Sequence, residues 1–193
     1  MKKVIRTIAM AAILFTSINV NANEPRIITS NDSKSLVVQL EAKSAATLVR
    51  LVDTEGNVIF NDNAKNAKAY MKKFDLNALP QGFYILELDD SLRTLTYSIE
   101  IDKNSVNILS KEESLKPVYT KTENKLLLNL LNTGEQSIEI KVFDSNDHIL
   151  FSEVVTDTVV LKKVFNFETA PKDTYSIVVK KQDEVYYETF DLK

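Results

Sequence analysis

Apolar and polar residues alternate along most of this chain. Leu36, Val38 and Leu40 are separated by single residues, and the stretches that begin at Tyr84 and Tyr175 keep the same period of two. In an extended strand successive side chains point to opposite faces, so this period places the apolar side chains on one face. The pattern therefore predicts β-strands that bury one face and expose the other.

Short polar segments with turn-forming residues separate these runs. Residues 53–57 (Asp-Thr-Glu-Gly-Asn) are typical of a type I turn followed by a left-handed Gly56, which is a common hairpin connection. In residues 144–148 (Asp-Ser-Asn-Asp-His), Asp147 takes the place of that glycine, and Asp tolerates a positive φ. About seven short strands in roughly 80 residues are typical of an immunoglobulin-like β-sandwich.

The chain also repeats itself at a fixed spacing of 91 residues. Residues 24–102 align without a gap on residues 115–193. Ten of the 79 aligned positions are identical, and among them Phe74 meets Phe165, Pro80 meets Pro171 and Tyr84 meets Tyr175.

The repeat predicts two tandem domains in an all-β chain, each an immunoglobulin-like or fibronectin-III-like β-sandwich. The first is expected at residues 23–102 and the second at residues 115–193. Residues 103–114 join them, and their polar composition predicts a linker. Because that segment contains neither Gly nor Pro, an extended strand is the alternative there.

Residues 1–22 are typical of an export signal. They have a basic start at Lys2, Lys3 and Arg6, an unbroken apolar run over residues 8–15, and Ala22 at the predicted cleavage site. A membrane span needs about 20 apolar residues, and polar residues follow this run too soon. We expect cleavage after Ala22 and an exported protein that is periplasmic, at the cell surface or extracellular.

The composition excludes several classes of function. The 193 residues include no Cys, no Trp and a single His, so disulfides, thiol chemistry and His-rich metal sites are not expected. The formal net charge of −3 offers no basic surface for nucleic acid. We therefore expect no cofactor, no metal ion and no nucleic-acid partner.

Residues 76–84 carry a Leu-x-x-Leu-Pro-x-Gly-x-Tyr motif before an alternating strand, with the hairpin of residues 52–58 upstream. This combination resembles two related bacterial groups. One is a family of small secreted immunoglobulin-like sandwich domains with no assigned function. The other is the C-terminal sorting domain of proteins exported through the type 9 (Por) secretion system. The resemblance covers most of the first copy, whereas Ala170 and Asp173 depart from the motif in the second. It implies the fold, and it implies no catalysis.

The motif residues have a structural interpretation. The Pro and Gly in residues 79–82 favour a β-turn. The tyrosine resembles that of a tyrosine corner, whose hydroxyl bonds back to the chain just upstream. The residues assigned to this structural motif are Leu79, Pro80, Gly82 and Tyr84 in the first copy, and Pro171 and Tyr175 in the second.

Other polar residues are weak candidates for chemistry. His148 lies in a turn, a catalytic role would need a nucleophile and an orienting acid around it, and Asn57 holds the equivalent place in the first copy. Counted from Asp144, the segment matches an EF-type Ca²⁺ loop only at Asn146, so a plain hairpin turn is the preferred interpretation. No pair of carboxylates lies in a motif for glycoside hydrolysis. We expect no enzyme and no catalytic residue.

Two pairs of neighbouring residues indicate surfaces. Tyr186 and Tyr187 must point to opposite faces of a strand, so one packs in the core and the other lies on the sheet surface. Tyr is enriched at binding hot spots, which makes this pair a possible contact surface. The lysines at residues 72–73 and 162–163 are interpreted as protection of a sheet edge against self-association.

Together these features indicate a non-catalytic structural or protein-interaction module, with loops and unpaired sheet edges as its binding surfaces. The expected partner is another protein at the cell envelope, and no membrane span is expected. Two alternatives stay open. The chain could bind a glycan or small ligand through the more aromatic second copy, or it could be a type 9 secretion sorting-like domain.

Overall fold

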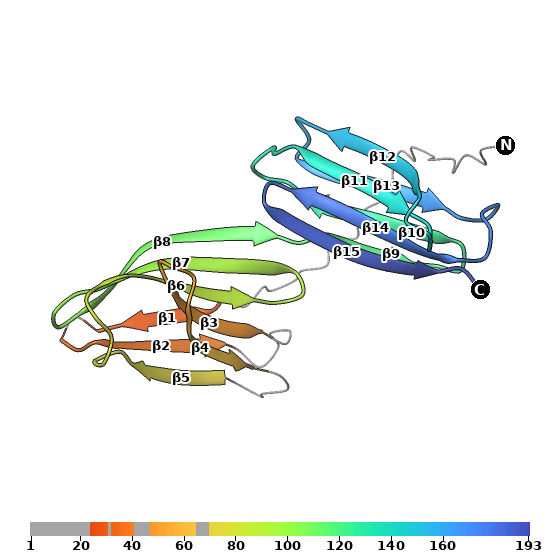
Figure 1. The fold of residues 1–193 in the computed structure, drawn as a ribbon. Coiled ribbons are helices and arrows are strands. Elements are labelled where there is room, and N and C mark those ends of the chain that lie inside the picture. The colour runs from red at the N-terminus through yellow and green to blue at the C-terminus, as the bar shows by residue number, and fades with distance from the viewer. Residues whose placement is uncertain (1–23, 31, 41–46, 65–69) are drawn as a thin grey trace. The chain divides into compact units, whose positions relative to one another are not determined.

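The computed structural model describes residues 24–30, 32–40, 47–64 and 70–193. The predicted signal peptide lies outside these residues. The chain divides between Ser114 and Leu115 into two compact units, which we call domain 1 (described from Glu24 to Ser114) and domain 2 (Leu115 to Lys193). Every element of both domains is a β-strand, and the prediction of two tandem immunoglobulin-like β-sandwiches is confirmed (Figure 1).

Domain 1 consists of a three-stranded and a five-stranded sheet. The smaller sheet has the strand order β1-β2-β5, and the larger has the order β4-β3-β6-β7-β8. The strands are β1 (Arg26–Thr29), β2 (Ser35–Leu40), β3 (Leu48–Asp53), β4 (Val58–Asn63), β5 (Tyr70–Asp75), β6 (Gly82–Asp89), β7 (Arg93–Ile101) and β8 (Val106–Leu115).

Domain 2 has a three-stranded sheet of order β13-β10-β9 and a four-stranded sheet of order β12-β11-β14-β15. All pairings with a defined register in either domain are antiparallel. The strands are β9 (Val118–Lys121), β10 (Lys125–Leu131), β11 (Ile138–Phe143), β12 (Ile149–Val155), β13 (Val160–Asn166), β14 (Thr174–Lys181) and β15 (Glu184–Asp191).

The sequence repeat is also a structural repeat. Strands β1 to β7 recur in the same order and the same sheet positions as β9 to β15. Even the irregularity in the ladder recurs, because a register shift lies at Leu51/Val52 between β3 and β4 and at Val142/Phe143 between β11 and β12. Strand β8 is the exception, since none of the described residues of domain 2 forms its equivalent.

The predicted alternation of apolar and polar positions matches the alternation of buried and partly exposed side chains in the structure. On β6 and β7, Leu86, Leu88, Leu95 and Ile99 are at most 2% exposed, while the residues between them are only partly buried. Full burial of one such side chain contributes about 1.5–3 kcal/mol. Domain 2 is built in the same way and adds an aromatic group in which Phe167 stacks on Phe190, with ring centroids 4.7 Å apart.

Both predicted hairpin turns contain a left-handed residue at the expected place. Gly56 has a φ of 85° and Asp147 a φ of 60°. The turns close in the same way, because the amide of Asp53 donates to the carbonyl of Asn57 and the amide of Asp144 to that of His148, each at 3.1 Å. These turns fix where β4 and β12 begin.

The segment expected as a linker needs a correction. Most of residues 103–114 belong to β8, which pairs with β7 as the outermost strand of the five-stranded sheet of domain 1. A tight turn precedes it, in which the amide of Asp102 donates to the carbonyl of Ser105 at 3.0 Å. Val106 is fully buried at the start of the strand. This segment is therefore part of domain 1.

Candidate functional site

The motif tyrosines form the same contact in both domains. The hydroxyl of Tyr84 donates to the carbonyl of Pro80 at 3.0 Å, and that of Tyr175 donates to the carbonyl of Pro171 at 2.6 Å. Tyr175 is only 1% exposed, and burial raises the pKa of its phenol. These hydrogen bonds hold the turn before β6 and β14 against the core, which is a structural role.

The other motif residues also support the turn of domain 1. Leu79 packs against the core, and its amide donates to the carbonyl of Leu76 at 3.0 Å. Gly82 begins β6 with a φ of 150°, a conformation that residues with a side chain rarely adopt. In domain 2 the equivalent Asp173 instead accepts a hydrogen bond from the amide of Ser145 at 3.3 Å.

His148 and Asp144 lie together, but their geometry is that of a turn. His148 Nδ1 is 3.0 Å from Asp144 Oδ2, and Asp144 Oδ1 accepts the amides of Asn146 and His148 at 2.9 Å each. These bonds, with the His148 amide first, lower the pKa of the Asp144 carboxyl. The described residues contain no cluster of three or more potential metal ligands. Asp53 and Asn57 repeat the arrangement in domain 1.

Lys72 and Lys163 occupy equivalent places on the edge strands β5 and β13 of the smaller sheets. Lys72 Nζ lies 3.0 Å from Asp62 Oδ2 and 4.2 Å from the ring centre of Phe60. Lys163 pairs with Glu153 and lies 5.0 Å from the ring centre of Phe151. Each lysine therefore bridges the two sheets of its own domain.

Tyr186 and Tyr187 both lie on β15, and their environments differ. Tyr186 packs against the core of domain 2, whereas Tyr187 is 73% exposed on the outer face of the sheet. The register explains the difference, because Tyr186 pairs with the buried Val179 and Tyr187 with Val178 on the other face of β14. Tyr187 is the member of the pair that is available for contact.

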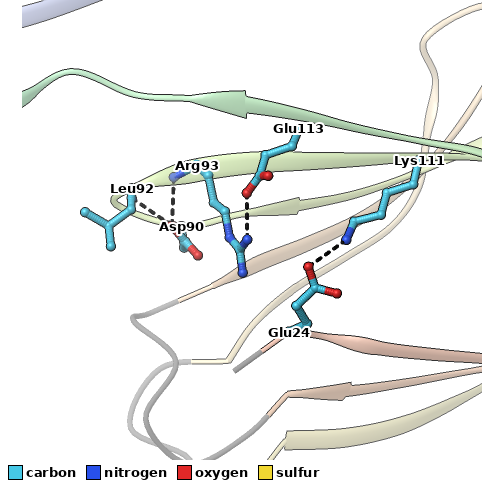
Figure 2. Close-up of polar contacts among 6 residues, drawn as sticks. All are labelled: Glu24, Asp90, Leu92, Arg93, Lys111 and Glu113. Carbon is cyan, nitrogen blue, oxygen red and sulfur yellow. Dashed lines mark hydrogen bonds and ion pairs between the residues drawn. The ribbon is translucent and has the colours of Figure 1, made fainter. Parts of the chain in front are cut away.

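Strand β15 is an edge of its sheet, whereas β7, its equivalent in domain 1, is not. In domain 1 β8 lies alongside β7 (Figure 1). Figure 2 shows two ion pairs that hold β8: Arg93 Nη1 is 2.6 Å from Glu113 Oε1, and Lys111 Nζ is 3.2 Å from Glu24 Oε1. In domain 2 no described strand pairs with the outer side of β15.

The turn that leads into β7 is itself well ordered. The carboxylate of Asp90 accepts the amides of Leu92 at 2.7 Å and Arg93 at 2.9 Å, which closes the β6–β7 hairpin (Figure 2). Arg93 is thereby positioned at the start of β7. Burial alone would lower the pKa of its guanidinium, but the hydrogen bond and charge of Glu113 outweigh burial, so that pKa is raised.

Side-chain burial reflects the difference between the two strands. Leu95 and Tyr97 of β7 are 1% and 5% exposed. The equivalent residues of β15, Tyr186 and Glu188, are only half-buried. An additional strand beside β7 accounts for this difference, because it covers inward-facing side chains that an edge strand leaves partly open. The inward-facing Tyr186 and Glu188 are thus less covered than their equivalents on β7, whereas Phe190 near the end of the strand is buried.

Polar groups lie under this open edge. Glu188 of β15 forms an ion pair with Lys121 of β9, which links the two sheets of domain 2. Nearby, the hydroxyl of Tyr119 is buried without a hydrogen-bond partner among the described residues. Burial, together with the charge of Glu188, raises the pKa of that hydroxyl.

Sequence reasoning preferred a linker for residues 103–114 and gave the extended strand that forms β8 only as the alternative, so it did not identify β15 as an edge. The available signal was weak: Val106 and Ile108 alternate with Asn107, but the residues that follow are mostly charged.

Among the described residues, no helix is long and apolar enough to cross a membrane.

Residues 32–109 match the family model described as the secretion system C-terminal sorting domain. The match covers β2 to β7 and the beginning of β8 in domain 1, which is less than half of the chain. Domain 1 is thus an immunoglobulin-like β-sandwich related to the type 9 sorting domains, as the sequence motif indicated. The match supports an exported protein. No curated protein matches the chain.

Three solved structures illustrate the structural likeness. The BSP domain of a biofilm-associated protein shares 13% identity at a TM-score of 0.28; the alignment covers 90% of this chain and 31% of that one. A segment of two fibronectin type III domains from chicken tenascin shares 9% identity at a TM-score of 0.30, and the alignment covers 86% of this chain and 98% of that one. The FN1–FN3 domains of chicken CNTN1 share 9% identity at a TM-score of 0.29, and the alignment covers 83% of this chain and 60% of that one. This chain therefore spans about a third of the first of these structures, and the scores carry no functional argument.

Proposed function

We propose that this chain is a non-catalytic exported protein-interaction module that binds an extended segment of another protein along β15. One observation supports the proposal: among the described residues β7 pairs with an additional strand, β8, whereas no strand pairs with the outer side of its structural equivalent β15. The two domains share their strand order, so a strand beside β15 would extend the sheet of domain 2 as β8 extends that of domain 1. The partner is expected at the cell envelope.

The chemistry of β15 suits strand addition. On an edge strand, every second residue directs its amide and carbonyl away from the sheet, and these groups hydrogen-bond to an added strand. Side chains beside the ladder then provide specificity. Tyr187 and Val185, 73% and 41% exposed, offer apolar contact on the outer face. Tyr is among the residues that dominate binding energy at interfaces.

The first experiment is cross-linking followed by affinity purification from intact cells, with periplasmic, surface and medium fractions kept apart. The wild type is compared with Tyr187→Lys, which places a charge at the centre of β15. Met71→Lys is the matched control, because Met71 is 74% exposed on an edge strand of domain 1. We expect one stoichiometric partner that is retained by the control and lost from Tyr187→Lys.

Hydrogen exchange then identifies the mode of binding. Strand addition predicts slower exchange of backbone amides in residues 184–191 when the partner is bound. A glycan that stacks on Tyr187 would alter Tyr fluorescence without protecting alternate amides of β15, and that outcome would support the glycan alternative. A partner lost equally from both lysine variants, or no protection of β15, contradicts strand addition.

A type 9 sorting-like role is the second candidate, and the family match over residues 32–109 supports it. It predicts that a reporter fused to the chain is carried beyond the outer membrane, and that deletion of domain 1 from the fusion abolishes this export. A reporter that remains in the periplasm with both domains present contradicts a sorting role. That result leaves the interaction proposal untouched, because binding at β15 does not require export across the outer membrane.

A further inference from the structure

Strand β12 is the least protected long edge in the described part of the chain. It forms the opposite edge of the sheet that ends in β15. Proteins commonly place charged residues, especially lysine, on edge strands to prevent pairing with other chains. The other edge strands of seven or more residues, β8, β13 and β15, each contain at least two charged residues. Strand β12 reads Ile-Leu-Phe-Ser-Glu-Val-Val and contains only Glu153.

Aliphatic side chains are exposed along this edge. Ile149, Leu150 and Val154 are 57%, 40% and 60% exposed. The equivalent strand of domain 1 is more polar. There β4 has Asn61, Asp62 and Asn63 at the positions of Ser152, Glu153 and Val154. The two repeats therefore differ at the edge where self-association would occur.

We propose that β12 pairs with β12 of a second copy of this chain, antiparallel and centred on Ser152. In this register Leu150 faces Val154 of the second copy, and Val154 faces Leu150 in turn. Direct aliphatic pairs of this kind stabilise antiparallel strands. The two four-stranded sheets would join into one continuous sheet across a two-fold axis.

The one charge on the strand does not oppose this pairing. Glu153 is already engaged by Lys163 of its own domain, and across the proposed two-fold axis it would face Phe151 rather than another carboxylate. The β15 edge behaves differently, because a fully overlapping antiparallel pair of β15 strands would place Glu184 opposite Asp191. Like charges directly opposite are destabilising, so a second copy fits β12 and not β15.

A single cysteine tests the register directly. The chain has no Cys, so Ser152→Cys introduces one thiol at the proposed two-fold axis. Opposed Cα atoms in an antiparallel pair are about 4.5–5.5 Å apart, within the range that a disulfide spans. The matched control is Asn61→Cys, at the equivalent position of β4. Under oxidised glutathione we expect Ser152→Cys to form a covalent dimer about tenfold faster than the control.

Charge variants test the same surface without cysteine. Replacing both Leu150 and Val154 with Lys is expected to leave only monomers in sedimentation velocity, whereas the wild type shows concentration-dependent dimers. The variant with Glu at both positions should likewise be monomeric. Because each Lys would face a Glu, an equimolar mixture of the two variants should recover the dimer. Circular dichroism verifies that each variant is folded.

Each result bears on the proposal. Cross-linking of Ser152→Cys no faster than that of Asn61→Cys, a wild type that stays monomeric at high concentration, or a mixture of Lys and Glu variants that does not associate would each overturn pairing at β12. The proposal is independent of binding at β15, because Tyr187→Lys leaves β12 unchanged.

Discussion

Tyr84 and Tyr175 occupy the same place in the two domains, and the hydroxyl of each donates to the carbonyl of the residue four positions before it, at 3.0 and 2.6 Å. That acceptor is a proline in both cases, Pro80 and Pro171. The hydrogen bond thus survives although the second motif has lost its glycine. It indicates that the corner depends on the tyrosine and the proline turn rather than on Gly82.

Removal of one hydroxyl should therefore weaken its domain. Tyr175→Phe keeps the buried ring but deprives the Pro171 carbonyl of its donor, so we expect the free energy of unfolding of domain 2 to fall by about 1 kcal/mol. Urea unfolding followed by circular dichroism measures this. Tyr187→Phe is the control, because Tyr187 is 73% exposed and its loss should change little. Equal effects of the two substitutions would show that the corner contributes no stability.

The hairpin turns predict opposite effects for two substitutions. Gly56→Ala forces a side chain into a φ of 85° and should destabilise domain 1 by about 1 kcal/mol. Asp147→Gly relieves the same conformation in domain 2 and should stabilise it by about 0.5 kcal/mol.

Gly134→Ala serves as the control for the first substitution, since Gly134 has no positive φ and an added Cβ meets only the flexible side chain of Gln136. Thermal unfolding by calorimetry compares the three variants. If Gly56→Ala is no less stable than Gly134→Ala, backbone strain at this turn is not the reason for the glycine.

The strands and turns could be predicted because alternation directly encodes which side faces the core. The pattern at Leu36, Val38 and Leu40 became the fully buried face of β2. The 91-residue spacing located the equivalent strand, β10, but with the wrong face inward. It aligns these residues with Leu127, Asn129 and Leu131, whereas the buried residues of β10 are Leu126, Leu128 and Leu130. The alternation also showed that Tyr186 and Tyr187 face opposite sides. It could not show which one is buried, because that depends on the register of β15 against β14.

An extended strand was only the alternative for the segment that forms β8, and its pairing with β7 and the sheet edges could not be predicted in this way. Lys111, Glu112 and Glu113 suggest a solvated linker when considered along the chain, and only pairing with β7 places Glu113 beside Arg93. The contacts of Lys72 and Lys163 were missed for a similar reason, because each joins strands of different sheets. Such pairings depend on which strands are neighbours in space, and local sequence patterns do not specify that.

The assignment of β8 to domain 1 predicts where truncation of a side chain is costly. Val106 is fully buried at the start of the strand, so Val106→Ala should reduce the free energy of unfolding of domain 1 by about 2 kcal/mol. Leu109→Ala is the control on the same strand, because Leu109 is 53% exposed. Urea unfolding of both variants checks this. If Val106→Ala costs no more than Leu109→Ala, β8 is not part of the domain 1 core.

The contact between Asp62 and Lys72 predicts a pH dependence of stability. The hydrogen bond from Lys72, followed by smaller contributions that include the Tyr70 hydroxyl, lowers the pKa of the Asp62 carboxyl below its ordinary value of 3.8. A group whose pKa is lower in the folded state stabilises the fold above its unfolded pKa. That stabilisation is lost as the pH falls through the folded pKa. Domain 1 should therefore lose stability on acidification, and part of this loss belongs to Asp62.

Asp62→Asn and Lys72→Met each remove one partner, so both should flatten the decline in unfolding midpoint between about pH 5 and pH 2. The unfolding midpoint of the double variant should depend on pH as much as that of Asp62→Asn alone, because Lys72 affects this pH dependence only through the Asp62 carboxylate. Urea midpoints across this range provide the measurement. Both side chains of this ion pair are partly exposed. If the unfolding midpoints of both single variants depend on pH as strongly as that of the wild type, the ion pair contributes nothing to stability.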